Sequence, residues 1–91
     1  MPKQIQFTSE VWREGDMYVA YSPELDISSC GKTLEESRLR LKESVGLLLE
    51  ETEKMGTLEE LLEESGFKKQ DAANWRGPEI LTVEKIKLAF S

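Results

Sequence analysis

The most constraining feature of the sequence is a helix-start signal at Thr33. Thr33 followed by Glu36 matches a capping box, in which the hydroxyl accepts a hydrogen bond from an N–H of the first turn and the glutamate reaches back. We therefore expect a helix from Leu34 to about Glu51, with an i,i+4 ion pair between Glu36 and Arg40 on its outer side. At about 100° per residue, the apolar residues of this segment form one face: Leu34, Leu41, Val45, Leu48 and Leu49. Such a helix has to bury this face against another element.

Other residues of this helix indicate its surroundings. Ser37 and Ser44 lie beside the apolar face and are small enough to let the helix approach a sheet closely. Leu39 and Leu47 fall on the outer side, away from that face. Two outward leucines indicate a second apolar contact. The chain's own next helix and another subunit are both open as the group that covers them.

The residues before the helix have the pattern of three strands. Residues 3–11 alternate between apolar and polar side chains, as a half-buried strand does. Residues 14–16 supply a turn, and residues 17–21 form the returning strand. Pro23 ends that strand because proline has no N–H to donate. The polar segment 26–30 is expected to be a third strand at or near a sheet edge.

A second helix-start signal follows the long helix. Thr57 and Glu60 form another capping box, which predicts a short helix from Leu58 to Ser65. Gly66 is expected to end this helix in the left-handed conformation, with Phe67 packing back onto the last turn.

The remaining segments complete the expected fold. Residues 68–78 have the composition of a loop, and this loop carries Trp75. Residues 80–90 alternate again and predict a last strand, most simply placed beside the first. The chain is therefore expected to be one α+β domain, residues 1–91, with the order β-β-β-α-α-β and with residues 53–78 as a helix-loop insertion before the last strand.

Length and charge limit the possible partners. A chain of 91 residues has room for one core and a thin stability margin, so we expect a homo-oligomer, a dimer or a tetramer. The net charge of −6 argues against duplex DNA as a partner, because phosphate contacts need basic residues, and suits a basic protein better. The chain has neither a signal-peptide pattern nor an apolar run long enough for a membrane span, so we expect a cytoplasmic protein.

The sequence lacks the usual catalytic residue sets. It contains no histidine, which is the commonest general base and metal ligand, and no glycine-rich phosphate-binding loop. Cys30 has no base partner and is expected to be a packed or half-exposed strand residue. A two-metal nuclease site would need acids in the middle of the first strand, which has none. We therefore expect no enzyme activity, no cofactor and no metal site.

Two groups of residues are candidates for a partner or oligomer surface. The acidic group lies in the second helix and consists of Glu59, Glu60, Glu63 and Glu64. These glutamates either form an ordinary solvated helix face or compete with RNA phosphates for a basic partner. The aromatic group consists of Trp12, Tyr18 and Trp75. Base stacking needs a positively charged groove, which the sequence does not offer, so packing in the core or an interface is the favoured role of these rings.

One segment resembles a known family. Residues 18–37, YVAYSPELDISSCGKTLEES, are similar to the signature of HicB-like antitoxin domains. The resemblance covers residues 3–52 well and residues 79–90 more loosely. It implies a partial RNase H-like fold of three antiparallel strands, a helix across one face and a fourth strand beside the first.

The same resemblance implies a function. HicB-like domains lack nuclease acids, and the resemblance implies that this chain binds and masks a small basic HicA-like toxin that cleaves mRNA. Many members also carry a DNA-binding module, which this sequence does not have, so direct DNA binding is not expected. The alternative is a self-assembling domain of the same fold with no toxin partner.

Overall fold

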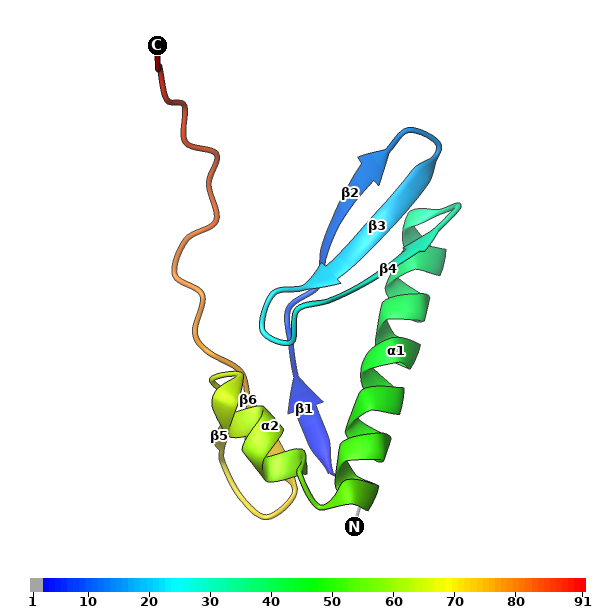
Figure 1. Ribbon diagram of the computed structural model, residues 1–91, viewed down its shortest axis with the longest axis vertical. Coiled ribbons are helices and arrows are strands. Elements are labelled where there is room, and N and C mark those ends of the chain that lie inside the picture. The colour runs from blue at the N-terminus through cyan, green and yellow to red at the C-terminus, as the bar shows by residue number, and fades with distance from the viewer. Residues whose placement is uncertain (1–2) are drawn as a thin grey trace.

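The computed structural model describes residues 3–91 and has an α+β fold, as predicted. Its strands form two three-stranded sheets, one in the order β2-β3-β4 and the other in the order β1-β6-β5 (Figure 1). The elements in chain order are β1 (Gln4–Gln6), β2 (Glu10–Glu14), β3 (Met17–Ser22), β4 (Ile27–Gly31), α1 (Leu34–Met55), α2 (Leu58–Glu64), β5 (Lys68–Lys69) and β6 (Asn74–Arg76).

The sheet β2-β3-β4 is an antiparallel meander. Gly15 and Asp16 connect β2 to β3, and the positive φ of Gly15, 58°, is one that glycine adopts without steric cost. The register pairs Val11 with Ala20 and then Ala20 with Ser29, so these three side chains face the same way. Helix α1 covers this face, and the core there consists of Ala20, Leu41 and Val45. The predicted returning strand over residues 17–21 is thereby confirmed.

Helix α1 begins where the sequence predicted. The Thr33 hydroxyl accepts a hydrogen bond from the N–H of Glu36 at 3.0 Å. The Glu36 carboxylate pairs with Arg40 at 2.9 Å, which confirms the expected ion pair. The helix runs four residues beyond Glu51 to Met55, and Gly56 ends it with a φ of 75°. Leu34, which was expected in the core, is exposed.

Helix α1 and β4 approach each other closely, as the small residues predicted. Ser37 is fully buried, and Ser44 shares a hydrogen bond of 3.0 Å with Ser29 of β4. A Cβ on Gly31 would lie 2.7 Å from the backbone nitrogen of Ser37. Only a residue without a side chain fits at this position without a backbone shift.

The second half of the chain forms its own small core. Leu58 and Leu62 of α2 pack with Phe67 and Trp75, and Gly66 has the expected left-handed conformation with a φ of 86°. The prediction that Trp75 lies in a loop was wrong, because Trp75 is the middle residue of β6. Its side chain is 5% exposed, which agrees with the packing role favoured for the aromatic rings.

The second predicted capping box was also wrong. Helix α2 begins at Leu58 as expected, but the Thr57 side chain accepts no hydrogen bond from its first turn. The φ and ψ of Thr57, −114° and 8°, are not the extended values of an N-cap residue, so its hydroxyl turns toward the carbonyl of Thr52 at 3.5 Å instead.

The first predicted strand, residues 3–11, is split into β1 and the start of β2. Between them, the N–H of Thr8 donates to both carboxylate oxygens of Glu24, at 3.0 and 2.9 Å. This N–H is thus taken by a side chain rather than by a neighbouring strand. The bend at residues 7–9 lets β1 and β2 join different sheets.

The predicted last strand, residues 80–90, does not form within the described chain. Residues 77–91 carry no helix or strand, and Figure 1 shows them leaving the rest of the molecule. The strand beside β1 is instead β6, which pairs with β1 in parallel. The hairpin β5-β6, within the segment expected as a loop, turns at Asp71. This carboxylate accepts hydrogen bonds from the N–H of Ala73 and from Asn74, which lower its pKa.

Candidate protein-interaction surface

The face of the β2-β3-β4 sheet that turns away from α1 carries a pair of aromatic rings, of which Trp12 is exposed and Tyr21 is half-buried. Trp12 pairs with Val19 across β2 and β3, and Tyr21 lies in the next cross-strand row. The rings of Trp12 and Tyr21 meet edge to face, with centroids 6.2 Å apart. The indole N–H of Trp12 also donates to Glu14 at 2.9 Å. The ring contact and the Trp12 hydrogen bond orient the two side chains on this face, and aromatic side chains of this kind are common at contact surfaces between proteins.

The hydroxyl of Tyr21 anchors the same surface to the β3–β4 turn. It donates to Asp26 at 2.8 Å, and this hydrogen bond to a carboxylate raises the pKa of the phenol. Asp26 has a φ of 54°, a conformation that aspartate adopts more readily than most residues. Tyr21 was not predicted as a surface residue, although the two-residue turn at Gly15 and Asp16 sets the register that places it beside Trp12.

Other residues expected at a surface are placed differently. Tyr18 lies on the α1 side of the sheet, opposite to Trp12, and is half-buried. Trp75 belongs to the core. Cys30 lies in the row of Trp12 and Val19 and is exposed, contrary to the packed or half-exposed position expected for it, because nothing in the described chain covers this face. Of the three aromatic candidates, only Trp12 lies on the exposed surface.

The two edges of this sheet differ in how open they are. At the β4 edge, Arg40 of α1 donates to the backbone carbonyl of Cys30 at 3.2 Å, so a helix side chain occupies part of that edge. The β2 edge pairs with no strand among residues 3–91. In an antiparallel pair, every second residue of an edge strand directs its N–H and C=O outward. The edge of β2 therefore offers backbone groups for another strand.

The two outward leucines of α1 are exposed, as predicted. Leu39 is 58% exposed and Leu47 is 64% exposed. Helix α2 packs near Leu49, at the other end of the core, and leaves both leucines uncovered. Of the two groups expected to cover them, the chain's own next helix is excluded.

Leu39 borders a hollow of about 310 Å³ next to the start of β2. The hollow lies between the flank of α1 and the residues just before β2, and its lining consists of Phe7, Ser9, Glu35, Arg38, Leu39, Leu41 and Lys42. A strand added to the open edge of β2 would have its α1-facing side chains over this hollow.

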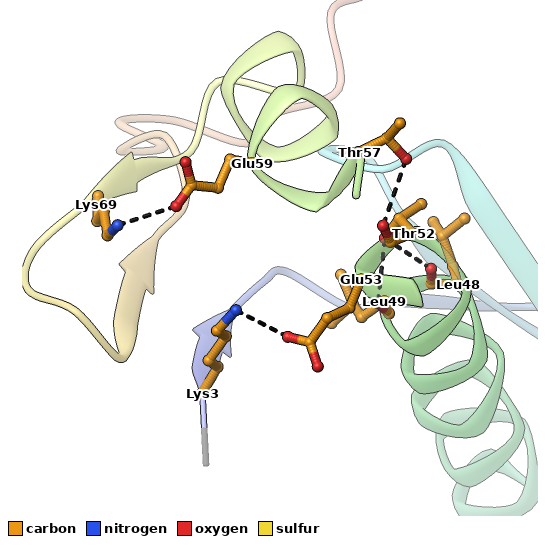
Figure 2. A network of polar contacts seen from close by, with 8 residues as sticks. All are labelled: Lys3, Leu48, Leu49, Thr52, Glu53, Thr57, Glu59 and Lys69. Atoms are coloured by element: carbon orange, nitrogen blue, oxygen red, sulfur yellow. Dashed lines mark hydrogen bonds and ion pairs between the residues drawn. The ribbon is translucent and has the colours of Figure 1, made fainter. Parts of the chain in front are cut away.

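The acidic candidates lie together on the outer face of α2. Glu59, Glu60, Glu63 and Glu64 are all exposed, opposite to the buried Leu58 and Leu62. Glu59 pairs with Lys69 at 3.0 Å (Figure 2). Among residues 3–91, no lysine or arginine nitrogen comes within 4.0 Å of the carboxylates of the other three glutamates. This face therefore keeps most of its negative charge.

Two of the chain's own lysines are already engaged near this face. Figure 2 shows Lys3 reaching across to Glu53 near the end of α1, with a distance of 2.9 Å between the nitrogen and the carboxylate. The hydrogen bond with Glu53 raises the pKa of Lys3. Lys69, besides its contact with Glu59, lies 5.7 Å from the centre of the Trp75 ring. A partner that contacts the α2 glutamates would have to bring its own positive charge.

The described residues also form a groove over the small core. This groove of about 390 Å³ lies between β1 and the end of α1. Its floor is apolar, with Leu49, Leu58 and Trp75, and Lys3 and Glu53 lie at its rim. Within residues 3–91, no three histidine, cysteine, aspartate or glutamate side chains are grouped as a metal site needs. Neither described helix has the length and apolar composition that crossing a lipid bilayer requires.

Comparison of the chain with protein-family models, with curated proteins and with solved structures found no match.

Proposed function

We propose that this chain is a non-catalytic protein-interaction domain of the HicB-like kind, an antitoxin that binds and masks a small basic HicA-like toxin. The observation that carries the proposal is the outer face of α2, where Glu60, Glu63 and Glu64 have no cation beside them in the described chain. A ribonuclease binds the phosphates of its substrate through basic residues. A fixed row of carboxylates is a suitable competitor for the same residues.

The architecture supports the proposal. A HicB-like domain is expected to have a three-stranded meander with a helix on one face and a further strand beside the first. The sheet β2-β3-β4 covered by α1, with β6 parallel to β1, is consistent with this partial RNase H-like arrangement. A toxin that cleaves mRNA acts where mRNA is translated, so we place the complex in the cytoplasm.

The test is a tagged pull-down of the full chain from cells that express it, at moderate salt. We expect a small basic protein to co-purify, and we expect its ribonuclease activity to fall when this chain is added. Replacing Glu60, Glu63 and Glu64 by lysine is expected to weaken the complex by about tenfold or more, which is about 1.4 kcal/mol, and to reduce the salt dependence of binding.

A matched control changes the same amount of charge elsewhere. Glu43, Glu51 and Glu79 are exposed and lie outside the α2 face, so their replacement by lysine leaves that face intact. An equal loss of affinity in both triple variants would mean that only net charge matters. Unchanged affinity in the α2 variant would contradict the proposed contact, and absence of any basic partner would contradict the antitoxin role.

The second candidate function is a self-assembling domain of the same fold, with no toxin partner. The exposed apolar segment 80–90 is the observation that favours it. A homo-oligomer that co-purifies with no basic protein and suppresses no ribonuclease would select this candidate.

A further inference from the structure

Residues 79–90, which we term the arm, expose an unusual amount of apolar side chain. Ile86 is 79% exposed, Leu88 is 78% exposed and Phe90 is 92% exposed. In an extended conformation, where successive side chains alternate, these three lie on one side and Lys85 and Lys87 on the other. The arm thus has the pattern of a half-buried strand and no strand beside it in the described chain.

The chain's own β2 is too short to pair with residues 85–90, the apolar end of the arm. The parallel pairs of β1 and β6, such as Ile5 with Trp75, have a constant sequence difference of 70 residues. Continuing this register into β2 would place Glu14, its last residue, opposite Glu84. Residues 85–90 would then extend past the end of β2 and remain uncovered.

Backbone pairing in that register is also prevented just after β1 and β6, at Thr8 and Pro78. Thr8, which would stand opposite Pro78, donates its N–H to the Glu24 carboxylate. Pro78 has no N–H to donate to a ladder. The chain therefore ends its internal pairing at β6, and the arm turns away from its own β2.

The free edge of β2 has features that match the arm. Side chains of an added strand that face α1 would cover the hollow beside Leu39 and Phe7. On the opposite face of the sheet, Glu10 and Glu14 flank Trp12 in β2. With Ile86, Leu88 and Phe90 toward the hollow, the alternating lysines of the arm would lie along these two carboxylates.

We propose that two copies of this chain exchange their arms. In the dimer, residues 85–90 of one copy pair with the free edge of β2 in the other. Ile86, Leu88 and Phe90 pack into the hollow beside Leu39, and Lys85 and Lys87 lie along Glu10 and Glu14.

A second copy fits this site better than an unrelated protein for two reasons. Both complementary parts, the arm and the β2 edge, are present once in every chain, so a two-fold axis generates two identical contacts and closes the assembly. The exchange also covers the open β2 edge, which would otherwise remain available for uncontrolled pairing.

The first test is the mass of the purified full chain by sedimentation equilibrium. We expect about twice the chain mass of 10.4 kDa. Replacing Ile86, Leu88 and Phe90 by serine is expected to give a monomer that keeps the helical circular dichroism signal of α1 and α2 and loses only the strand signal of the exchanged arm, because these side chains are exposed in the single chain. Leu39→Asp is expected to weaken the dimer at least tenfold. Leu47→Asp, at the other outward leucine, is the matched control and is expected to leave the dimer unchanged.

The second test locates the contact by disulfide formation. In a Cys30→Ser background, a chain with Leu39→Cys is mixed with a chain that has cysteine at position 86, 88 or 90. A disulfide needs Cα atoms roughly 4.4–6.8 Å apart, so at least one arm position is expected to give a cross-linked heterodimer, whereas Leu47→Cys is expected to give none with any of them.

Three outcomes would overturn the inference. The first is a monomer at all concentrations. The second is a dimer that survives the triple serine substitution. The third is a dimer in which no arm position cross-links to position 39. These experiments use the purified chain alone and leave the α2 glutamates intact, so their failure would not bear on toxin binding.

Discussion

At the scale of single residues, two glycines on either side of the contact between β4 and α1 have opposite roles. A Cβ on Gly31 would lie 2.7 Å from the Ser37 nitrogen and 2.9 Å from the Cβ of Glu36, which is closer than real side chains approach. A Cβ on Gly46, in the middle of α1, would meet nothing within 4 Å. Gly31 is thus required by the close packing of β4 on α1, whereas Gly46 only weakens the helix.

We expect Gly31→Ala to destabilise the protein by about 1–3 kcal/mol, because the start of α1 has to move away from β4. Gly46→Ala is the matched control and is expected to stabilise it by up to about 1 kcal/mol, because alanine favours the helix. Urea unfolding at one fixed protomer concentration measures both changes. A stable Gly31→Ala variant would show that the contact between β4 and α1 is looser than these distances indicate.

At the scale of elements, the two helix starts have the same sequence pattern and different geometry. Thr33 has extended backbone angles, φ −133° and ψ 160°, and accepts from Glu36. Thr57 has a ψ of 8° and makes no such bond with α2. The short connection from Gly56 places Thr57 so close to the end of α1 that its hydroxyl reaches the Thr52 carbonyl.

Alanine substitutions are expected to separate the two threonines. Thr33→Ala removes a working cap and is expected to lower the free energy of unfolding by about 1 kcal/mol. Thr57→Ala removes no cap and is expected to change it by less than about 0.5 kcal/mol. Thermal and urea unfolding of the two variants, compared at equal concentration, check this difference. Equal losses would mean that the Thr57 hydroxyl caps α2 in solution.

The elements also show how far local sequence patterns can predict this fold. The start of α1, the hairpin at Gly15 and the end of α2 at Gly66 follow from residues next to one another, and all three were predicted. The strand β6 was missed because three residues around Trp75, Asn74 to Arg76, are too short for an alternating pattern. Its parallel partner β1 lies 70 residues away, and no local pattern encodes such a pairing.

The candidate surface residues also divide into those that a local sequence pattern predicts and those that depend on contacts between distant elements. The exposure of Leu39 and Leu47 and the position of the acidic face could be predicted, because helical periodicity alone decides which side a residue occupies. Packing was the favoured role of Trp75, but the sequence could not decide between the core and an interface, because that choice depends on how α2 and β6 meet. The strand predicted from the alternation in residues 80–90 does not form in the described chain, because an alternating pattern does not determine which strand pairs with it.

At the scale of the whole molecule, the core and the arm are separate. The two clusters of buried apolar residues extend no further along the chain than Trp75, and residues 79–91 are all exposed. The molecule measures 49 × 30 × 19 Å, and the arm contributes to its length without adding to its core (Figure 1). Folding of the body and pairing of the arm are therefore expected to be separable.

A chain shortened to end at Glu79 is expected to test this separation. The full chain unfolds as a dimer if the arms are exchanged, so a tenfold rise in protomer concentration adds about 1.4 kcal/mol to its unfolding free energy. For a dimer of this size the midpoint of thermal unfolding would rise by roughly 3–6 °C. The shortened chain keeps every residue of both cores, so it is expected to fold with a midpoint that does not depend on concentration. Calorimetry of both chains over a tenfold concentration range measures the difference.

If the midpoint of the full chain also proved independent of concentration, the arm would not join two copies. If the shortened chain failed to fold, the arm would be part of the body, and its exposed position in the single chain would not represent the protein in solution.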